Sequence, residues 1–304
     1  MKLDVMEEKT THRVLAYGRA KTGKTALVGQ LARKYRLHYF DLEDGVKTLL
    51  SPGMLPPEFH SNVDVIRLPD SQTASIAAET LLKVFRKPFS EKRICWYHGK
   101  VDCQACAKDT NAAHSTIDLS KFTKEDVVVL DSVTQLSLSI MYAILKDKLK
   151  GDTVESFLEF RGDFREYRAQ GFILDRIFGT IQAADVNVCA ISHEMLIESN
   201  VDSTQKEDKP VGTGVEIIVP VAGTRNFSRN FARYFDTVVY LGVVNNRHRA
   251  YSNTVHDGNI VLGSRTGIDI SKAGEPGQPT FIDLFERKGG TTSGIAAKQP
   301  VSFK

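Results

Sequence analysis

Hydrophobic residues in the first part of the chain form short runs separated by stretches of helical spacing. Apolar runs at 13–17, 37–41 and 63–68 predict buried strands. Apolar side chains recur every three to four residues over 26–35 and 71–85, which predicts a helix after the first strand and another after the third. The order is therefore strand, helix, strand, strand, helix.

The same alternation resumes further along the chain. The predicted elements are a strand at 127–130, helices at 133–149 and 156–184, a strand at 186–191, a long loop or hairpin at 195–221, a short helix, and a strand at 237–241. Alternating strands and helices imply crossover connections on a mostly parallel sheet. The sequence thus predicts an α/β fold whose sheet is flanked by helices.

Two segments depart from this pattern. Residues 87–125 are polar, contain cysteines and lack an apolar pattern to fold around, so we expect an insertion there. The residues after 272 are rich in Gly, Pro, Ser, Thr and Lys and predict a loosely attached tail. The expected organisation is a core made of 1–86 and 126–272, an insertion at 87–125, and a C-terminal segment at 273–304.

The amino-acid composition is consistent with the predicted α/β fold and adds only a few expectations. A quarter of the 304 residues are charged, the net charge is +3, and no apolar run reaches the roughly 18 residues that span a bilayer. We expect one large soluble domain with no membrane partner. The N-terminus lacks a secretion signal, so we expect a cytoplasmic protein whose four cysteines stay reduced.

A phosphate-binding motif, G-x-x-x-x-G-K-[ST], lies between the first strand and the first helix. Its residues are Gly18, Arg19, Ala20, Lys21, Thr22, Gly23, Lys24 and Thr25, followed by Ala26 in the helix. The glycines let backbone N–H groups surround phosphates, Lys24 reaches the outer phosphates, and Thr25 offers its hydroxyl to Mg²⁺. An ordinary glycine-rich turn is disfavoured because strand, motif and helix are in register. The motif predicts binding of a nucleoside triphosphate.

Polar residues at later strand ends supply candidate chemistry. Asp131 ends the strand at 127–130, where a nucleotide-binding sheet places the carboxylate that holds Mg²⁺; the alternative is a helix cap. Glu43 follows the strand at 37–41 and is a candidate general base, against a solvated acidic turn. His193 follows the strand at 186–191 and is a candidate sensor of the γ-phosphate, against a structural histidine.

These motifs occur in an order that resembles the RecA-type ATPases: Gly18–Thr25, then Phe40-Asp41-Leu42-Glu43, then Val129-Leu130-Asp131-Ser132-Val133, then Ile191-Ser192-His193-Glu194. More narrowly, the chain resembles the small phage-encoded RecA-like proteins that support single-strand annealing and recombination. The resemblance implies a RecA-like P-loop fold, ATP with Mg²⁺, and Glu43 as general base. It also implies that His193 replaces the glutamine of RecA and that the following loop contacts single-stranded DNA.

The resemblance is incomplete at the N-terminus, where only about a dozen residues precede the first strand, so filament formation is not implied. RecA-type sites also receive a cation from a neighbouring subunit in a ring or filament. Here Arg265 is the candidate for that cation, Arg247 and Arg249 are its rivals, and a surface turn is the alternative.

A basic stripe is the candidate DNA contact. Arg225, Arg229 and Arg233 are spaced by four residues, and Phe227, Phe231 and Phe235 are offset from them by two, so a helix would place the two sets on opposite faces. Lys206 and Lys209 in the neighbouring loop add charge. A solvated helix face is the alternative.

The insertion contains four soft ligands, Cys95, His98, Cys103 and Cys106, in the order C-x2-H-x4-C-x2-C. Two closely spaced pairs of this kind predict a structural zinc site that orders the segment. The alternatives are free thiols, or His114 in place of His98. Nearby cations and aromatic residues offer a small nucleic-acid or partner surface: Lys87, Lys92, Arg93, Lys100, Lys108, Trp96 and Tyr97.

Together these features predict an ATPase that binds single-stranded DNA in recombination or annealing, as a homo-oligomer, with a single-strand DNA-binding protein as a further candidate partner. One alternative is a ring helicase or other translocating motor. Another is a nucleotide-gated module that binds a partner and for which hydrolysis is incidental.

Overall fold

The computed structural model describes residues 11–70, 75–109, 111–146, 163–198, 216–245, 247–252, 259–265, 267–273 and 275–286.

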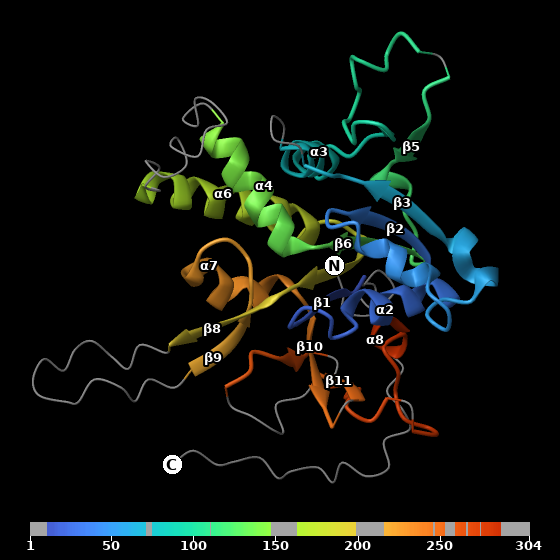
Figure 1. The fold of residues 1–304 in the computed structure, drawn as a ribbon, viewed down its shortest axis with the longest axis vertical. Helices are drawn as coiled ribbons and strands as arrows, with labels where there is room; N and C mark the ends of the chain where they lie inside the picture. The colour runs from blue at the N-terminus through green and yellow to red at the C-terminus, as the bar shows by residue number, and fades with distance from the viewer. Residues whose placement is uncertain are drawn as a thin grey trace, which may run out of the picture.

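An eight-stranded sheet forms the centre of the protein (Figure 1). Its strands are β1 Arg13–Gly18, β2 Arg36–Asp41, β3 Val63–Arg67, β6 Asp126–Asp131, β7 Asn187–Ser192, β10 Thr237–Val244, β11 Arg247–Tyr251 and β12 Gly263–Ser264. They lie in the order β11-β10-β1-β7-β6-β2-β3, with β12 also paired to β10. All pairs from β10 to β3 are parallel, and β11 and β12 run antiparallel to β10. The carboxyl ends of β1, β2, β6 and β7 therefore meet at one edge, where ligands of open α/β sheets bind.

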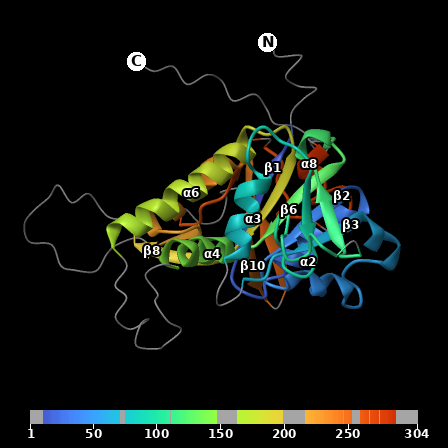
Figure 2. The ribbon, with the colours of Figure 1, turned by 90° about the horizontal axis from the view of Figure 1, so that it is seen from above.

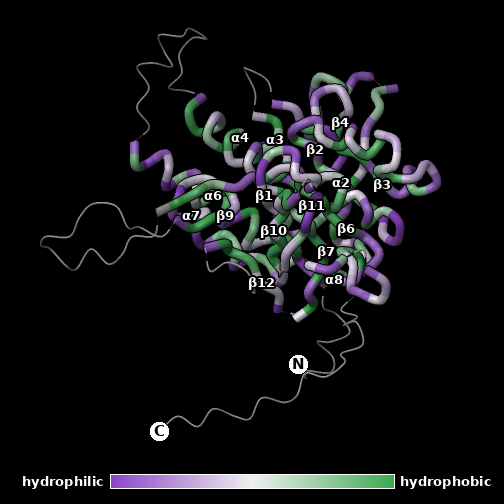
Figure 3. The backbone as a smooth tube through the Cα atoms, turned by 60° about the horizontal axis from the view of Figure 1, so that its bottom comes forward, coloured by the Kyte–Doolittle hydropathy of each residue, from purple (hydrophilic) through white to green (hydrophobic). Residues whose placement is uncertain are grey.

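Helices cover both faces of this sheet (Figure 2). The helices on one face are α3 Ile76–Val84, α4 Val133–Leu145, α6 Phe164–Gln182 and α7 Arg225–Asn230. The other face is covered by α2 Lys24–Gly29, the 3-10 turn Gln30–Arg33 and α8 Asp283–Glu286. Strand β1 shows why two cores form, because Leu15 and Tyr17 enter the first core while Val14 and Ala16 enter the second. Hydrophobic stretches accordingly gather at the centre of the molecule and hydrophilic ones at its periphery (Figure 3).

Shorter elements complete the fold. They are the hairpins β4 Lys92–Cys95 with β5 His114–Ile117 and β8 Glu194–Glu198 with β9 Glu216–Pro220, and the 3-10 turns Gly45–Leu50, Pro57–Asn62, Leu119–Lys121 and Phe231–Tyr234. None of the helices within the described ranges is both long and apolar enough to cross a membrane.

The structure confirms the predicted α/β fold and its mostly parallel sheet. The helix expected at 26–35 ends earlier, at Gly29, and continues as the 3-10 turn. The segment 195–221 contributes a hairpin, and β11 was not expected.

Two expectations about packing are wrong. The segment 87–125 does have apolar residues to fold around, because Ile94, Val101 and Ile117 are buried in the first core. The expected loose tail is wrong for its first part, because Phe281 just before α8 and Phe285 within it are buried in the second core. Residues 287–304 lie outside the described ranges.

Candidate nucleotide site

The phosphate loop connects β1 to α2 in a tightly packed turn. Gly18 approaches the neighbouring strand so closely that a Cβ atom there would lie 2.1 Å from the carbonyl oxygen of Leu241. Gly23 has φ 86 and Lys21 has φ 63, both in the left-handed region that favours glycine. Lys24 donates from Nζ to the carbonyl oxygens of Gly18 and Arg19 at 2.9 and 2.7 Å, so its ammonium lies across the loop. Burial lowers the pKa of Lys24.

Thr25 and Asp131, the candidate magnesium ligands, lie in contact and form the first half of the site. The hydroxyl of Thr25 donates to Asp131 Oδ2 at 2.9 Å, and the hydroxyl of Tyr39 donates to the same oxygen. Burial raises the pKa of Asp131 to about 6, against the hydrogen bonds that favour its ionised form. A hydroxyl and a carboxylate are the hard oxygen donors that suit Mg²⁺, so these two residues are compatible with the ion that such sites use.

Glu43 and His193, the candidate general base and the candidate γ-phosphate sensor, form the second half of the site. His193 Nε2 lies 3.4 Å from Glu43 Oε2, and the hydroxyl of Ser132 donates to Glu43 Oε1. Burial raises the pKa of Glu43, but hydrogen bonds from His193 and Ser132 outweigh it, so the pKa lies below its usual value. A general base must be ionised before it can accept a proton, and this arrangement keeps Glu43 ionised at neutral pH.

These two halves line one cleft of about 700 Å³. The cleft includes the phosphate loop from Lys21 to Ala26, Glu43, Asp131 and His193. Arg249 and Ala250 of β11 and Ile270 also line the cleft. Except for the loop's first three residues, the structure thus brings the predicted nucleotide-site residues together.

A family model described as an AAA domain matches residues 10–266. The chain belongs to this AAA-domain family. A solved structure with a similar chain is that of a prototypical ATPase from the type III secretion system of pathogenic bacteria, at 14% sequence identity and a TM-score of 0.35. The match covers 76% of this chain and 52% of that one, so this chain spans about half the length of the secretion ATPase. No curated protein matches the sequence.

The AAA domain has further contacts around its phosphate loop that the sequence did not indicate. His248 on β11 donates from Nδ1 to the carbonyl oxygen of Thr22 at 3.0 Å, which ties the edge strand to the loop. Arg19 donates from Nε to Glu194 Oε1 at 2.9 Å, which ties the loop to β8. Both contacts join residues far apart in sequence, so no local pattern reveals them.

Arg265, the candidate cation in trans, lies away from this cleft. Its side chain is 64% exposed and forms an ion pair with Asp236 at 3.4 Å, beside the first residue of β10. The phosphate loop follows the last residue of the parallel strand β1, so Arg265 lies at the opposite edge of the sheet from its own loop. Its rival Arg249 lines the chain's own cleft.

The predicted basic stripe is only partly formed. Helix α7 ends at Asn230 and a 3-10 turn follows, so the four-residue spacing of the arginines does not continue on one helical face. Arg225 and Arg233 are exposed, and Arg229 is half-buried. Arg233 donates to Asp175 of α6 at 2.7 Å and lies over the ring of Tyr234. Lys206 and Lys209 lie outside the described residues.

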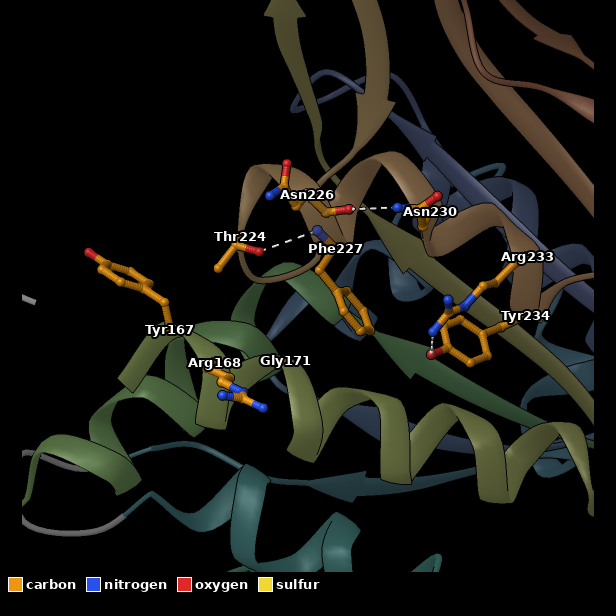
Figure 4. A pocket seen from close by; sticks show the side chains of 9 residues that line it. All are labelled: Tyr167, Arg168, Gly171, Thr224, Asn226, Phe227, Asn230, Arg233 and Tyr234. Atoms are coloured by element: carbon orange, nitrogen blue, oxygen red, sulfur yellow. Dashed lines mark hydrogen bonds between the residues drawn. The ribbon is translucent and has the colours of Figure 1, made fainter. Parts of the chain in front are cut away.

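The phenylalanines of this segment pack as expected, with Phe231 and Phe235 in the first core. Phe227 instead lines a shallow pocket of about 260 Å³ between α6 and α7 (Figure 4). Tyr167, Arg168, Asn226 and Tyr234 also line this pocket. It combines aromatic rings, amides and cations beside the arginine segment.

The four predicted zinc ligands lie together, with their ligand atoms all within 4.8 Å of one another. His98 Nδ1 is 3.7, 3.5 and 3.3 Å from the sulfur atoms of Cys95, Cys103 and Cys106. Zn–S and Zn–N bonds of about 2.3 and 2.0 Å in a tetrahedron place sulfur and nitrogen about 3.5 Å apart, so this cluster has the dimensions of a zinc site. His114 Nδ1 instead contacts Arg93 and the carbonyl oxygen of Ala112. The cluster is therefore compatible with zinc and uses His98 rather than His114.

Proposed function

We propose that this AAA domain hydrolyses ATP to control binding of single-stranded DNA in recombination or strand annealing. The observation that carries the hydrolytic part is the placement of Glu43, held by His193 and Ser132, across the cleft from the phosphate loop. The DNA part rests on the resemblance of the motif order and on the exposed Arg225 of α7, a helix that packs beside β9.

The residues of the cleft divide the reaction between them. Lys24 and the loop amides hold the phosphates of ATP. Mg²⁺ neutralises phosphate charge when bound, and Thr25 and Asp131 would hold it. Glu43 accepts a proton from water as the water oxygen bonds to the γ-phosphorus, and the bond to the β-phosphate oxygen breaks to leave ADP and phosphate.

His193 connects the nucleotide site to the β8–β9 hairpin, which we propose lies near the bound DNA. Its backbone carbonyl accepts a hydrogen bond from Val221 at 2.8 Å, directly after β9, while its ring contacts Glu43. We therefore assign His193 the role of relaying the nucleotide state to the β8–β9 hairpin. Arg265 lies too far round the sheet to serve its own site, so its proposed role requires a neighbouring copy in a homo-oligomer.

The test is ATP hydrolysis measured with and without single-stranded DNA. We expect DNA to bind and to raise the rate, and Glu43→Gln to lower the rate of hydrolysis about 10²- to 10⁴-fold while ATP still binds. DNA that neither binds nor changes the rate would exclude the DNA role. An intact biological activity in Glu43→Gln would favour a nucleotide-gated binding module instead, and directional strand displacement would favour a translocating motor.

Substitution of arginines in this segment tests the DNA contact. Arg225→Ala together with Arg229→Ala should weaken DNA binding and reduce its salt dependence. Arg233→Ala provides a comparison, because Arg233 is exposed but pairs with Asp175. Unchanged affinity and salt dependence in the Arg225→Ala, Arg229→Ala variant would remove these two residues from the contact.

We propose further that Cys95, His98, Cys103 and Cys106 bind one structural zinc ion. All four positions of a tetrahedral ion would be filled by protein, which leaves none for a substrate. The purified protein should contain about one zinc per chain. Cys103→Ala should lose it and Cys189→Ala, which changes a buried cysteine of β7 outside the cluster, should keep it.

A further inference from the structure

Two adjacent aromatic side chains project from the zinc knuckle, which we define as residues 95–106. Trp96 and Tyr97 are 64% and 74% exposed, and they lie between the first two proposed zinc ligands, Cys95 and His98. Aromatic rings usually stabilise a fold by being buried in it. Two neighbouring exposed rings therefore indicate a surface that binds a partner.

A hydrogen bond from the ring nitrogen fixes the orientation of the Trp96 indole. Its Nε1 donates to the hydroxyl of Ser115 at 3.0 Å, and its backbone N–H donates to the carbonyl oxygen of Ala113. Ser115 belongs to β5 and is itself buried. The ring is thus fixed in position while most of its surface remains open to solvent, which reduces the entropy lost when a flat group stacks on it.

The chain around these rings carries a net positive charge. The segment 87–109 contains five cations, Lys87, Lys92, Arg93, Lys100 and Lys108, and three carboxylates, Glu91, Asp102 and Asp109. Zinc with three thiolates adds one negative charge, so the segment stays positive when metal is bound. An excess of cations around exposed aromatic rings is complementary to a single strand of nucleic acid, whose phosphates carry negative charge and whose bases are flat.

We propose that Trp96 and Tyr97 form a stacking surface for bases of single-stranded nucleic acid, and that the surrounding cations neutralise its phosphates. This inference rests on the proposed zinc site, because the metal fixes the turn that presents both rings. It does not rest on the α7 arginines. The β4–β5 hairpin lies beside β3 at one edge of the sheet, and the β8–β9 hairpin lies on the other side of the molecule (Figure 1).

The chain offers a probe at the site itself, because Trp96 is its only tryptophan. Stacking of a base on an indole quenches its fluorescence. We therefore expect a dT oligonucleotide of about 15 nucleotides to quench the emission of the zinc-loaded protein as it binds, with binding followed independently by the anisotropy of a label on the oligonucleotide. Tyr97→Ala should weaken the affinity by about tenfold and keep its zinc, whereas Tyr97→Phe should bind as the wild type does.

Tyr142→Ala is the matched control, because Tyr142 is an exposed tyrosine on α4, outside the knuckle. Oligonucleotide that binds with unchanged Trp96 emission, and equally to Tyr97→Ala, would overturn this inference alone. An oligonucleotide that does not bind at all would remove the proposed DNA function as well. A response of Trp96 to polyglutamate but not to the oligonucleotide would overturn the inference in favour of an acidic protein partner.

Discussion

His193 and Glu43 contact each other across 150 residues of sequence, with Nε2 of the histidine 3.4 Å from Oε2 of the carboxylate. The contact joins the carboxyl ends of β7 and β2, two strands that are not neighbours in the sheet. It brings the proposed sensor of nucleotide state into contact with the proposed general base.

Replacing Glu43 should separate hydrolysis from binding. Glu43→Gln keeps the shape and one hydrogen-bond acceptor but cannot take a proton, so we expect the rate of ATP hydrolysis to fall about 10²- to 10⁴-fold with nucleotide affinity little changed. The measurements are steady-state turnover and the binding of a labelled ATP analogue. Glu58→Gln, at an exposed position in the turn Pro57–Asn62, is the control. Hydrolysis that persists in Glu43→Gln would mean that another group activates water.

Removing His193 should change the pH dependence of hydrolysis. The hydrogen bond from His193 helps to lower the pKa of Glu43. In His193→Ala that pKa should rise toward its usual value or above it, so Glu43 becomes protonated at higher pH and the acid limb of the rate profile shifts upward. The profile of kcat against pH measures this shift. An unchanged acid limb would show that Glu43 does not set it.

The ion pair between Arg13 and Asp236, at the sheet edge opposite the phosphate loop, should stabilise the fold in a pH-dependent way. Burial raises the pKa of Asp236, but Arg13, at 2.9 Å, outweighs it and holds the pKa below its usual value. Its contribution to the free energy of unfolding is therefore complete above the ordinary carboxyl pKa of about 4 and disappears as pH falls through the lower folded value. We expect Asp236→Asn to cost about 3 kcal/mol at pH 7 and progressively less in acid. Denaturant unfolding at several pH values tests this, and a constant difference would contradict it.

Gly99 should be needed for the zinc knuckle to pack against the end of β3. It has φ 60, and a Cβ atom there would lie 2.9 Å from the carbonyl oxygen of Arg67. Gly99→Ala should lower the free energy of unfolding by about 2 kcal/mol without removing a zinc ligand. Gly53→Ala separates the two causes, because Gly53 has φ 80 but open space around its Cβ position, and should cost about 1 kcal/mol. Equal costs at both positions would show that the contact with Arg67 contributes nothing.

The sequence was most informative at the ends of strands, where the chemistry of nucleotide binding requires a particular type of residue. Parallel strands bring their carboxyl ends to the same edge, so the position of Glu43, Asp131 and His193 at the ends of different strands already indicates one site. The zinc cluster was predictable for a similar reason, since close pairs of ligands chelate from a single turn.

The sequence was least informative where packing decides. The contact between His248 and Thr22 joins residues 226 positions apart, and nothing near either of them indicates it. The prediction of an arginine stripe required one continuous helix over residues 225–233. Helix α7 instead ends before Phe231, where a 3-10 turn begins and the ring of Phe231 packs against Phe178. The burial of Phe281 and Phe285 was hidden because the glycines and prolines around them suggested a loose tail.

Arg67 is held from two sides. The knuckle packs Gly99 against its backbone carbonyl, and its guanidinium donates to Asp44 Oδ1 at 2.8 Å, one residue beyond Glu43. The side chains of Arg67 and Asp44 thus lie between the turn of the proposed zinc site and the proposed general base. If zinc orders that turn, its loss can reach the nucleotide site through these two residues, so an assay of ATP turnover should record zinc occupancy as well.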